Sequence, residues 1–189
     1  MNTKGPFNGD GFLLNDFKAL AEKHKIKTIV ETGTHLAETA EVLADWCETL
    51  YTFETDKNWF RASLKTMKSK KNAKLFNMNS VEGLNKYLPE MEGPIMFFLD
   101  AHWESYNPLL DELAEIAKAG LKPVIVIHDF KVPNRPDLGF DSYKGQDYTF
   151  EWIHESIYAI YGENGYKFHY NDKAEGAKRG VIFIYPNEE

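Results

Sequence analysis

The chain has 189 residues, of which 43% are hydrophobic and 14% aromatic, and its formal net charge is −7. These values predict a globular protein with a buried core and exclude a disordered chain, so we expect one domain spanning residues 1–189. The negative charge argues against binding to duplex nucleic acid, because such binding needs a basic face that displaces counterions.

The cysteine content and the hydropathy of the chain exclude further classes of protein. Cys47 is the only cysteine, which excludes a disulfide framework within one chain and a cysteine zinc cluster. No apolar run approaches the roughly 18 residues of a membrane span, and the first residues lack the apolar stretch of a signal peptide. We therefore expect a soluble, cytoplasmic protein that does not interact with membranes.

In chain order, the first elements are a helical lead-in over residues 1–26 and then short apolar runs that alternate with amphipathic segments. Runs of this length and composition are typical of buried strands, and the segments between them are typical of helices. Residues 59, 60, 64 and 67, for example, form one apolar helical face in the segment 57–67. The strand-like runs are 28–30, 50–53, 75–76, 95–99, 124–127, 166–170 and 181–185.

The order of these elements predicts an α/β fold. Each of the first five runs precedes a helical pattern, which favours a parallel sheet with helices on both faces. Only a polar loop joins the last two runs, so they should pair antiparallel. We predict a Rossmann-like, doubly wound sheet of seven strands, in which five parallel βα units are closed by a C-terminal antiparallel hairpin. The long segment 131–150 is expected to be a substrate or lid loop.

The sequence "VETGTHLAETA" at residues 30–40 predicts a strand, a tight turn and a helix. Gly33 permits the turn, and the N–H groups of the following helix would face a ligand. A dinucleotide fingerprint has three glycines, but only Gly33 is present here. Glu54 follows the next strand, about 20 residues further on, where a carboxylate accepts hydrogen bonds from ribose hydroxyls. Asp56 is the alternative for that role.

Acidic residues and histidines also end the fourth and fifth predicted strands. Asp100, followed by His102, ends the fourth, and His128 with Asp129 ends the fifth. Because the ends of parallel strands meet at one edge of the sheet, these side chains should converge. They could bind a divalent metal, or form a base and its orienting partner. The alternative is that His128 only bonds to a neighbouring loop.

Taken together, these features resemble the class I S-adenosylmethionine-dependent methyltransferases, whose first motif is similar to "VETGTHLAETA" and whose sheet has the same order of elements. Within that class, "FFLDAHWESYNPLLDEL" and "VIVIHDF" look like the metal-dependent small-molecule O-methyltransferases of the catechol, macrocin and rhamnosyl types. The resemblance extends from about residue 27 to 185. It implies methyl transfer from S-adenosylmethionine to a hydroxyl of a small-molecule or sugar-like acceptor.

The resemblance also assigns residues by position. It implies that the cofactor is bound by Glu31, Gly33, Thr34, His35, Thr39, Glu54, Thr55, Asn79, Ser80 and Asp100. It implies a divalent metal held by Asp100 and Asp129. We add His128 as a third candidate ligand, and we expect catalytic roles for these three residues and His102. Asn79 and Ser80 have a second interpretation as helix caps. Trp103, Phe140, Tyr143 and Tyr148 are expected to cover the acceptor.

The chain departs from the family pattern at two places. Ala37 stands where the family often has a second glycine, and His128 and Phe130 flank Asp129 where it has an acidic or amide neighbour. An imidazole weakens the case for Mg²⁺ and leaves room for a transition metal, or for a metal-free mechanism with His128 as base. Alternatives are a methyltransferase-like binding protein without catalysis, a nicotinamide-dependent oxidoreductase, and a metal-dependent hydrolase or hydroxylase. A homodimer is left open.

Overall fold

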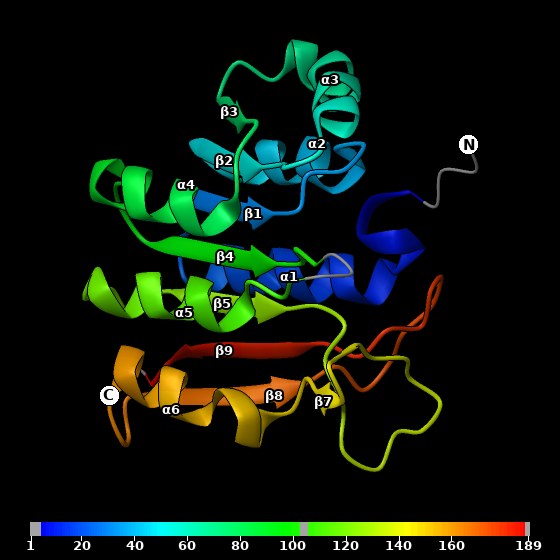
Figure 1. Cartoon of the computed structure of the whole chain (residues 1–189), viewed down its shortest axis with the longest axis vertical. Helices are drawn as coiled ribbons and strands as arrows, with labels where there is room; N and C mark the ends of the chain where they lie inside the picture. The colour runs from blue at the N-terminus through cyan, green and yellow to red at the C-terminus, as the bar shows by residue number, and fades with distance from the viewer. Residues whose placement is uncertain (1–4, 103–105, 188–189) are drawn as a thin grey trace.

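The computed structural model describes residues 5–102 and 106–187. Its centre is a seven-stranded sheet with the strand order β3-β2-β1-β4-β5-β9-β8 (Figure 1). The strands are β1 (Thr28–Thr32), β2 (Thr49–Phe53), β3 (Ala73–Phe76), β4 (Ile95–Leu99), β5 (Val124–Ile127), β8 (Tyr166–Tyr170) and β9 (Ile182–Pro186).

The pairing of these strands confirms the predicted fold class. β1 pairs in parallel with β2 and β4, β2 with β3, and β4 with β5. β9 lies antiparallel to β5, with Ile182 opposite Ile127, and β8 lies antiparallel to β9. A small ribbon that the sequence did not predict, β6 (Ser142–Tyr143) with β7 (Gln146–Asp147), lies within the segment 131–150.

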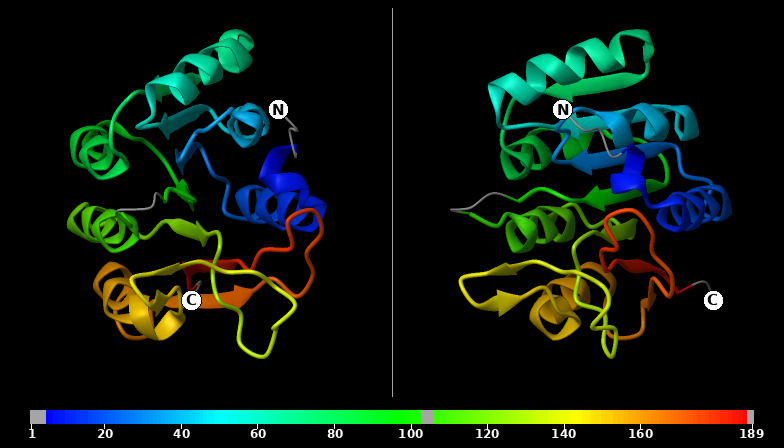
Figure 2. Two further views of the ribbon diagram at one scale, coloured as in Figure 1. Left: turned by 45° about the vertical axis from the view of Figure 1, so that its right-hand side comes forward. Right: turned by 90° about the vertical axis from the view of Figure 1, so that its right-hand side faces the viewer.

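Helices cover both faces of the sheet, as Figures 1 and 2 show. Alternate residues of β4 enter two separate cores, because side chains of a strand point to opposite faces. Phe97 packs in the core under α4–α6, and Phe98 packs in the core under α1 and α2. The helices are α1 (Gly11–Lys23), α2 (Glu38–Leu43), α3 (Lys57–Thr66), α4 (Ser80–Tyr87), α5 (Leu109–Lys118) and α6 (Phe150–Tyr161).

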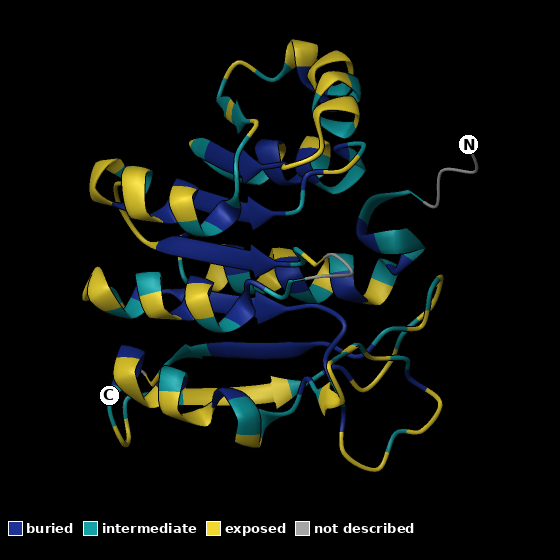
Figure 3. Ribbon diagram, in the orientation of Figure 1, coloured by how far each residue is buried: buried dark blue, intermediate teal, exposed yellow. Residues whose placement is uncertain are grey.

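Burial follows this layering. Every residue of β1, β4 and β5 is buried, as expected for parallel strands covered on both faces (Figure 3). The two edge strands differ: β3 has no buried residue, and the middle residues of β8 are exposed. Within residues 5–102 and 106–187, no helix is long and apolar enough to cross a membrane.

Helix starts agree with the capping signals in the sequence. The predicted helix 57–67 is α3, and the Asn79 side chain accepts from the Val81 N–H at the start of α4. Before α5, the Asn107 side chain accepts from the Leu109 N–H at 3.0 Å. These side chains satisfy N–H groups that have no partner inside the helix.

A tight turn at Pro6–Gly9 precedes α1 and reaches the sheet. Phe7 and Asn8 both have left-handed backbone, with φ of 52° and 55°. Phe7 is buried against Phe17 and Phe98, and its N–H donates to the Thr39 hydroxyl at 2.9 Å. The turn is thereby held over the first residues of α2.

Candidate functional site

A cavity of about 440 Å³ opens at the carboxyl ends of β1, β2 and β4. It gathers most of the residues that the sequence assigned to a cofactor or catalytic role. Asn79 and His128 do not line it, whereas Gly5, Asn8, Trp59 and Met78 line it without having been predicted. The predicted residues that line it are Glu31, Gly33, Thr34, His35, Thr39, Glu54, Thr55, Ser80, Asp100, His102 and Asp129.

The turn after β1 depends on Gly33, whose φ is 88°. A Cβ at this position would lie 3.0 Å from the carbonyl oxygen of Asp100, so the turn passes close to the end of β4. The N–H groups of Gly33 and Thr34 both donate to the Phe53 carbonyl. Ala37, at the end of the turn, is fully buried with a left-handed φ of 63°, a conformation that disfavours any residue with a Cβ.

Glu31 is a buried carboxyl group inside β1. The Thr52 hydroxyl donates to it at 2.6 Å, and the Thr34 hydroxyl lies 2.5 Å from that of Thr52. Burial raises the pKa of Glu31 to about 8, and the negative charges of Asp100 and Glu54 act in the same direction. Without a bound cation, Glu31 is therefore mostly protonated at neutral pH.

Glu54 connects the ends of β1 and β2. One of its carboxylate oxygens accepts from the His35 N–H at 2.7 Å, and the other accepts from the Asp56 N–H at 2.8 Å. These bonds fix the carboxylate at the cavity wall, and each oxygen keeps a lone pair for another donor. Asp56 itself caps α3 by accepting from the N–H groups of Asn58 and Trp59.

His128 lies between the two aspartates that end β4 and β5. Its Nδ1 is 2.9 Å from Asp100 Oδ1 and 3.2 Å from Asp129 Oδ1. Burial alone would lower the pKa of His128, but the two carboxylates outweigh it and raise the pKa to about 10. Burial would in turn raise the pKa of Asp129, yet His128 and Arg179 hold it below its usual range. His128 is thus a charged link within the site.

Two residues that the sequence did not single out complete this edge. Arg179 donates through Nε to Asp129 and through Nη2 to Asp141. Because β9 is antiparallel to β5 and Ile182 lies opposite Ile127, residues just before β9 must lie beside the end of β5. The predicted hairpin was therefore a signal that could have located Arg179. No comparable signal marks Asp141 within its long loop.

Glu112, in the first turn of α5, is a further buried acid beneath the site. It shares the apolar face of α5 with Leu109, Leu113 and Ile116, and it is 1% exposed. Burial raises its pKa to about 7, an effect that hydroxyls of Ser80 and Thr32 partly offset. The signal in the sequence was a carboxylate at a position of apolar helical periodicity.

The segment 131–150 lies beside the loop between β8 and β9, as the two views of Figure 2 show, and Gly139 bridges to Arg179. Of the aromatic residues expected to cover the acceptor, Tyr148 is buried and Phe140 is exposed. The Lys131 ammonium lies 4.9 Å from the Phe140 ring centre. Trp103 lies outside the described residues.

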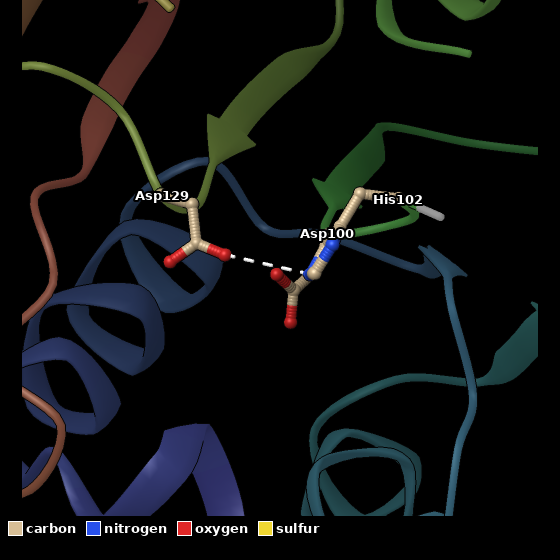
Figure 4. A group of neighbouring side chains, drawn as sticks. All are labelled: Asp100, His102 and Asp129. Carbon is tan, nitrogen blue, oxygen red and sulfur yellow. Dashed lines mark ion pairs between the residues drawn. The ribbon is translucent and has the colours of Figure 1, made fainter. Parts of the chain in front are cut away.

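The donor atoms at this edge can be tested against a divalent metal. Asp100, His102 and Asp129 each offer a ligand atom, and these atoms lie within 4.8 Å of one another (Figure 4). A divalent ion there would lie close to the Arg179 guanidinium, which already binds Asp129, and this costs Coulomb energy. As arranged, these residues therefore do not fit a resident divalent ion, and the metal stays a prediction from the resemblance.

The sequence matches no protein-family profile and no curated protein. Solved structures do match. The O-methyltransferase from Bacillus cereus in complex with SAH is 14% identical over 91% of this chain and 79% of its own, with a TM-score of 0.68. The O-methyltransferase TomG from Streptomyces achromogenes, involved in tomaymycin synthesis and in complex with SAM, is 15% identical over 94% and 79%, with the same TM-score of 0.68.

A ribosomal RNA methylase from Streptococcus thermophilus is also similar, at 9% identity over 93% of this chain and 97% of its own, with a TM-score of 0.62. The structure therefore has the class I methyltransferase fold that the resemblance predicted. At such low identity the likeness establishes the fold, and the reaction has to be argued from the site.

Proposed function

We propose that this protein transfers a methyl group from S-adenosylmethionine to a hydroxyl group of a small-molecule acceptor. The observation that carries the proposal is the cavity at the carboxyl edge of the sheet, with the Gly33 turn on one side and the fixed carboxylate of Glu54 on the other. Ligands of open α/β sheets bind at this edge. Complexes with SAH and SAM among the structural neighbours support the choice of cofactor.

The cavity offers a partner for each part of that cofactor. We assign the ribose hydroxyls to Glu54, which is already oriented by two N–H groups. Trp59 and Met78 give apolar walls for the adenine ring. Glu31 and Gly33 line the other end, where the positive charge of the cofactor would favour the ionised form of Glu31. The remaining proposed cofactor contacts are Thr34, His35, Thr39, Thr55, Ser80 and Asp100.

S-adenosylmethionine, when bound, supplies a methyl group on a positively charged sulfur. The chain must hold the acceptor oxygen in line with that methyl group and take the hydroxyl proton as the new O–C bond forms and the S–C bond breaks. His102 lines the cavity with a half-exposed side chain, and we propose it as the base: Asp129 would hold its Nε2–H, and Nδ1 would turn from Asp141 to the acceptor hydroxyl. His128 is already protonated at neutral pH, and its proposed role is to hold Asp100 and Asp129.

Two other functions are tested by the same experiment. A nicotinamide-dependent oxidoreductase would use a similar edge of the sheet, but only Gly33 of its three-glycine fingerprint is present. A methyltransferase-like binding protein would hold the cofactor without turnover. We propose titrating S-adenosylmethionine, S-adenosylhomocysteine and NADH into the full chain by calorimetry. Binding of NADH but of neither sulfur compound would refute the proposal.

Turnover separates an enzyme from a binding protein. Release of S-adenosylhomocysteine should be measured with a panel of phenols, diols and sugars as acceptors. His102→Ala is expected to lower turnover by about 100-fold or more, because general-base catalysis contributes at least this factor. Its affinity for S-adenosylhomocysteine should stay near wild type. His154→Ala is the control, since His154 is an equally accessible histidine on α6 that does not line the cavity.

A further inference from the structure

Backbone hydrogen bonds hold together the segments that surround Arg179. Three segments meet there: Phe130 N–H donates to Gly180 O at 2.8 Å, Gly180 N–H to Gly139 O at 2.8 Å, and Gly139 N–H to Lys178 O at 2.9 Å. The strand end after β5, the long loop and the β8–β9 loop are thus joined directly at Arg179.

Glycines make this approach possible. A Cβ on Gly180 would lie 2.0 Å from the Phe130 carbonyl oxygen, and a Cβ on Gly139 would lie 2.8 Å from Arg179 Nη1. A side chain at either position would displace the guanidinium or separate the segments. The Arg179 side chain is only 26% exposed, so its place beside the candidate site is set by packing as well as by charge.

Arg179 also closes a ring of ionisable groups. Asp129 uses Oδ1 for Arg179 and presents Oδ2 to His102 Nε2 at 3.6 Å. Asp141 does the same, with Oδ1 toward Arg179 and Oδ2 at 3.5 Å from His102 Nδ1. Each ring nitrogen of His102 therefore faces a carboxylate, and each of these carboxylates is bound to the same guanidinium.

We propose that Arg179 is the resident cation of this site: it neutralises Asp129 and Asp141, positions His102 between them, and excludes a divalent ion from the place where one would otherwise bind. A guanidinium suits this role, because its fork of donors can bridge two carboxylates and it stays charged at all physiological pH values. The proposal rests on the proposed function for the identity of His102 as base. It makes Arg179 a positioning residue, and it makes the site independent of added metal.

The test is calorimetric titration of the full chain with MnCl2 and with MgCl2. The wild type should bind neither ion below about 1 mM, whereas Arg179→Gln should bind Mn²⁺ about tenfold or more tightly, since Asp129 and His102 become free ligands. Arg179→Lys keeps the charge and should restore exclusion. Adding Asp129→Asn to Arg179→Gln should abolish the gained binding. A merely structural role for Arg179 predicts none of these changes.

Arg135→Gln is the matched control. Arg135 also pairs with a carboxylate of the same loop, Asp137, but within residues 5–102 and 106–187 this pair belongs to no group of side chains that could hold a metal ion. It should gain no ion binding. Wild-type binding of Mn²⁺ at micromolar concentration overturns the proposal even if Arg179→Gln does not fold. S-adenosylhomocysteine is titrated into the same samples: its failure to bind would refute the proposed function, while the metal result stands by itself.

Discussion

The Thr52 hydroxyl donates a 2.6 Å hydrogen bond to Glu31, between the neighbouring strands β1 and β2. The carboxyl group is buried, so it keeps its proton in the folded state up to about pH 8, whereas the pKa of an unperturbed glutamate is 4.5. Between these values the unfolded chain binds fewer protons than the folded one, and stability falls as pH rises.

Glu31→Gln should therefore flatten the dependence of stability on pH. From pH 5 to pH 8 the wild type is expected to lose about 2–4 kcal/mol more unfolding free energy than the variant. Urea unfolding at both pH values measures this difference. Glu112 is present in both proteins, so its own titration cancels in the comparison. Glu41→Gln, on the exposed side of α2, should keep the wild-type slope; an identical slope in Glu31→Gln would contradict the prediction.

Phe7 connects the N-terminal turn to the core and to the cavity. Phe7→Ala should lower the free energy of unfolding by about 3–5 kcal/mol, because it leaves a void between Phe17 and Phe98. It should also weaken binding of S-adenosylhomocysteine, since Gly5 and Asn8 line the cavity. Phe12→Ala is the control, because Phe12 is 41% exposed. Equal losses in both variants would show that Phe7 has no special role.

Ala37 has left-handed backbone at a position where it is fully buried. Ala37→Gly should raise the free energy of unfolding by about 1 kcal/mol, because glycine adopts this backbone without a steric penalty. Ala40→Gly in the following helix should lower it by about 1 kcal/mol, since helical backbone disfavours glycine. Chemical denaturation of the two variants gives opposite signs if the turn is strained, and the same sign if it is not.

Gly33→Ala tests the close approach of the turn to Asp100. Gly145 has a similar φ, 82° against 88°, but a Cβ there would meet nothing within 4 Å. Both alanine variants carry the cost of a left-handed residue, about 1–2 kcal/mol. Only Gly33→Ala should also displace the end of β4 and lower the affinity for S-adenosylhomocysteine by about tenfold or more. Equal affinities in the two variants would place the cofactor elsewhere.

The fold was predictable because burial on both faces leaves long apolar runs in parallel strands. The errors at strand ends have physical causes. β1 continues through Glu31 and Thr32, since a hydrogen bond and a raised pKa make a carboxyl group tolerable inside a strand. β3 begins at Ala73, two residues earlier than the apolar run, because its pairing with β2 starts there and an edge strand can leave Lys74 exposed. The β6–β7 ribbon is too short to give a periodic signal.

The site was predictable only where it follows strand ends. Because the carboxyl ends of parallel strands meet at one edge of the sheet, the sequence predicted that Glu31, Glu54, Asp100 and Asp129 lie close together, and all four line one cavity. Strand ends gave no information on Asp141, because its position depends on the path of a long loop. Strand ends also do not predict that both ring nitrogens of His102 face carboxylates, because side-chain geometry of this kind arises from tertiary packing.

The two sides of the site differ in the length of chain that their hydrogen bonds span. The bonds that shape the proposed cofactor side, from Thr52 to Glu31 and from His35 to Glu54, span 21 and 19 residues of sequence. The bonds from Arg179 to Asp129 and Asp141 span 50 and 38 residues. Closing longer loops costs more entropy and slows folding. The first side can therefore form early, while the second must wait until β9 has docked between β5 and β8.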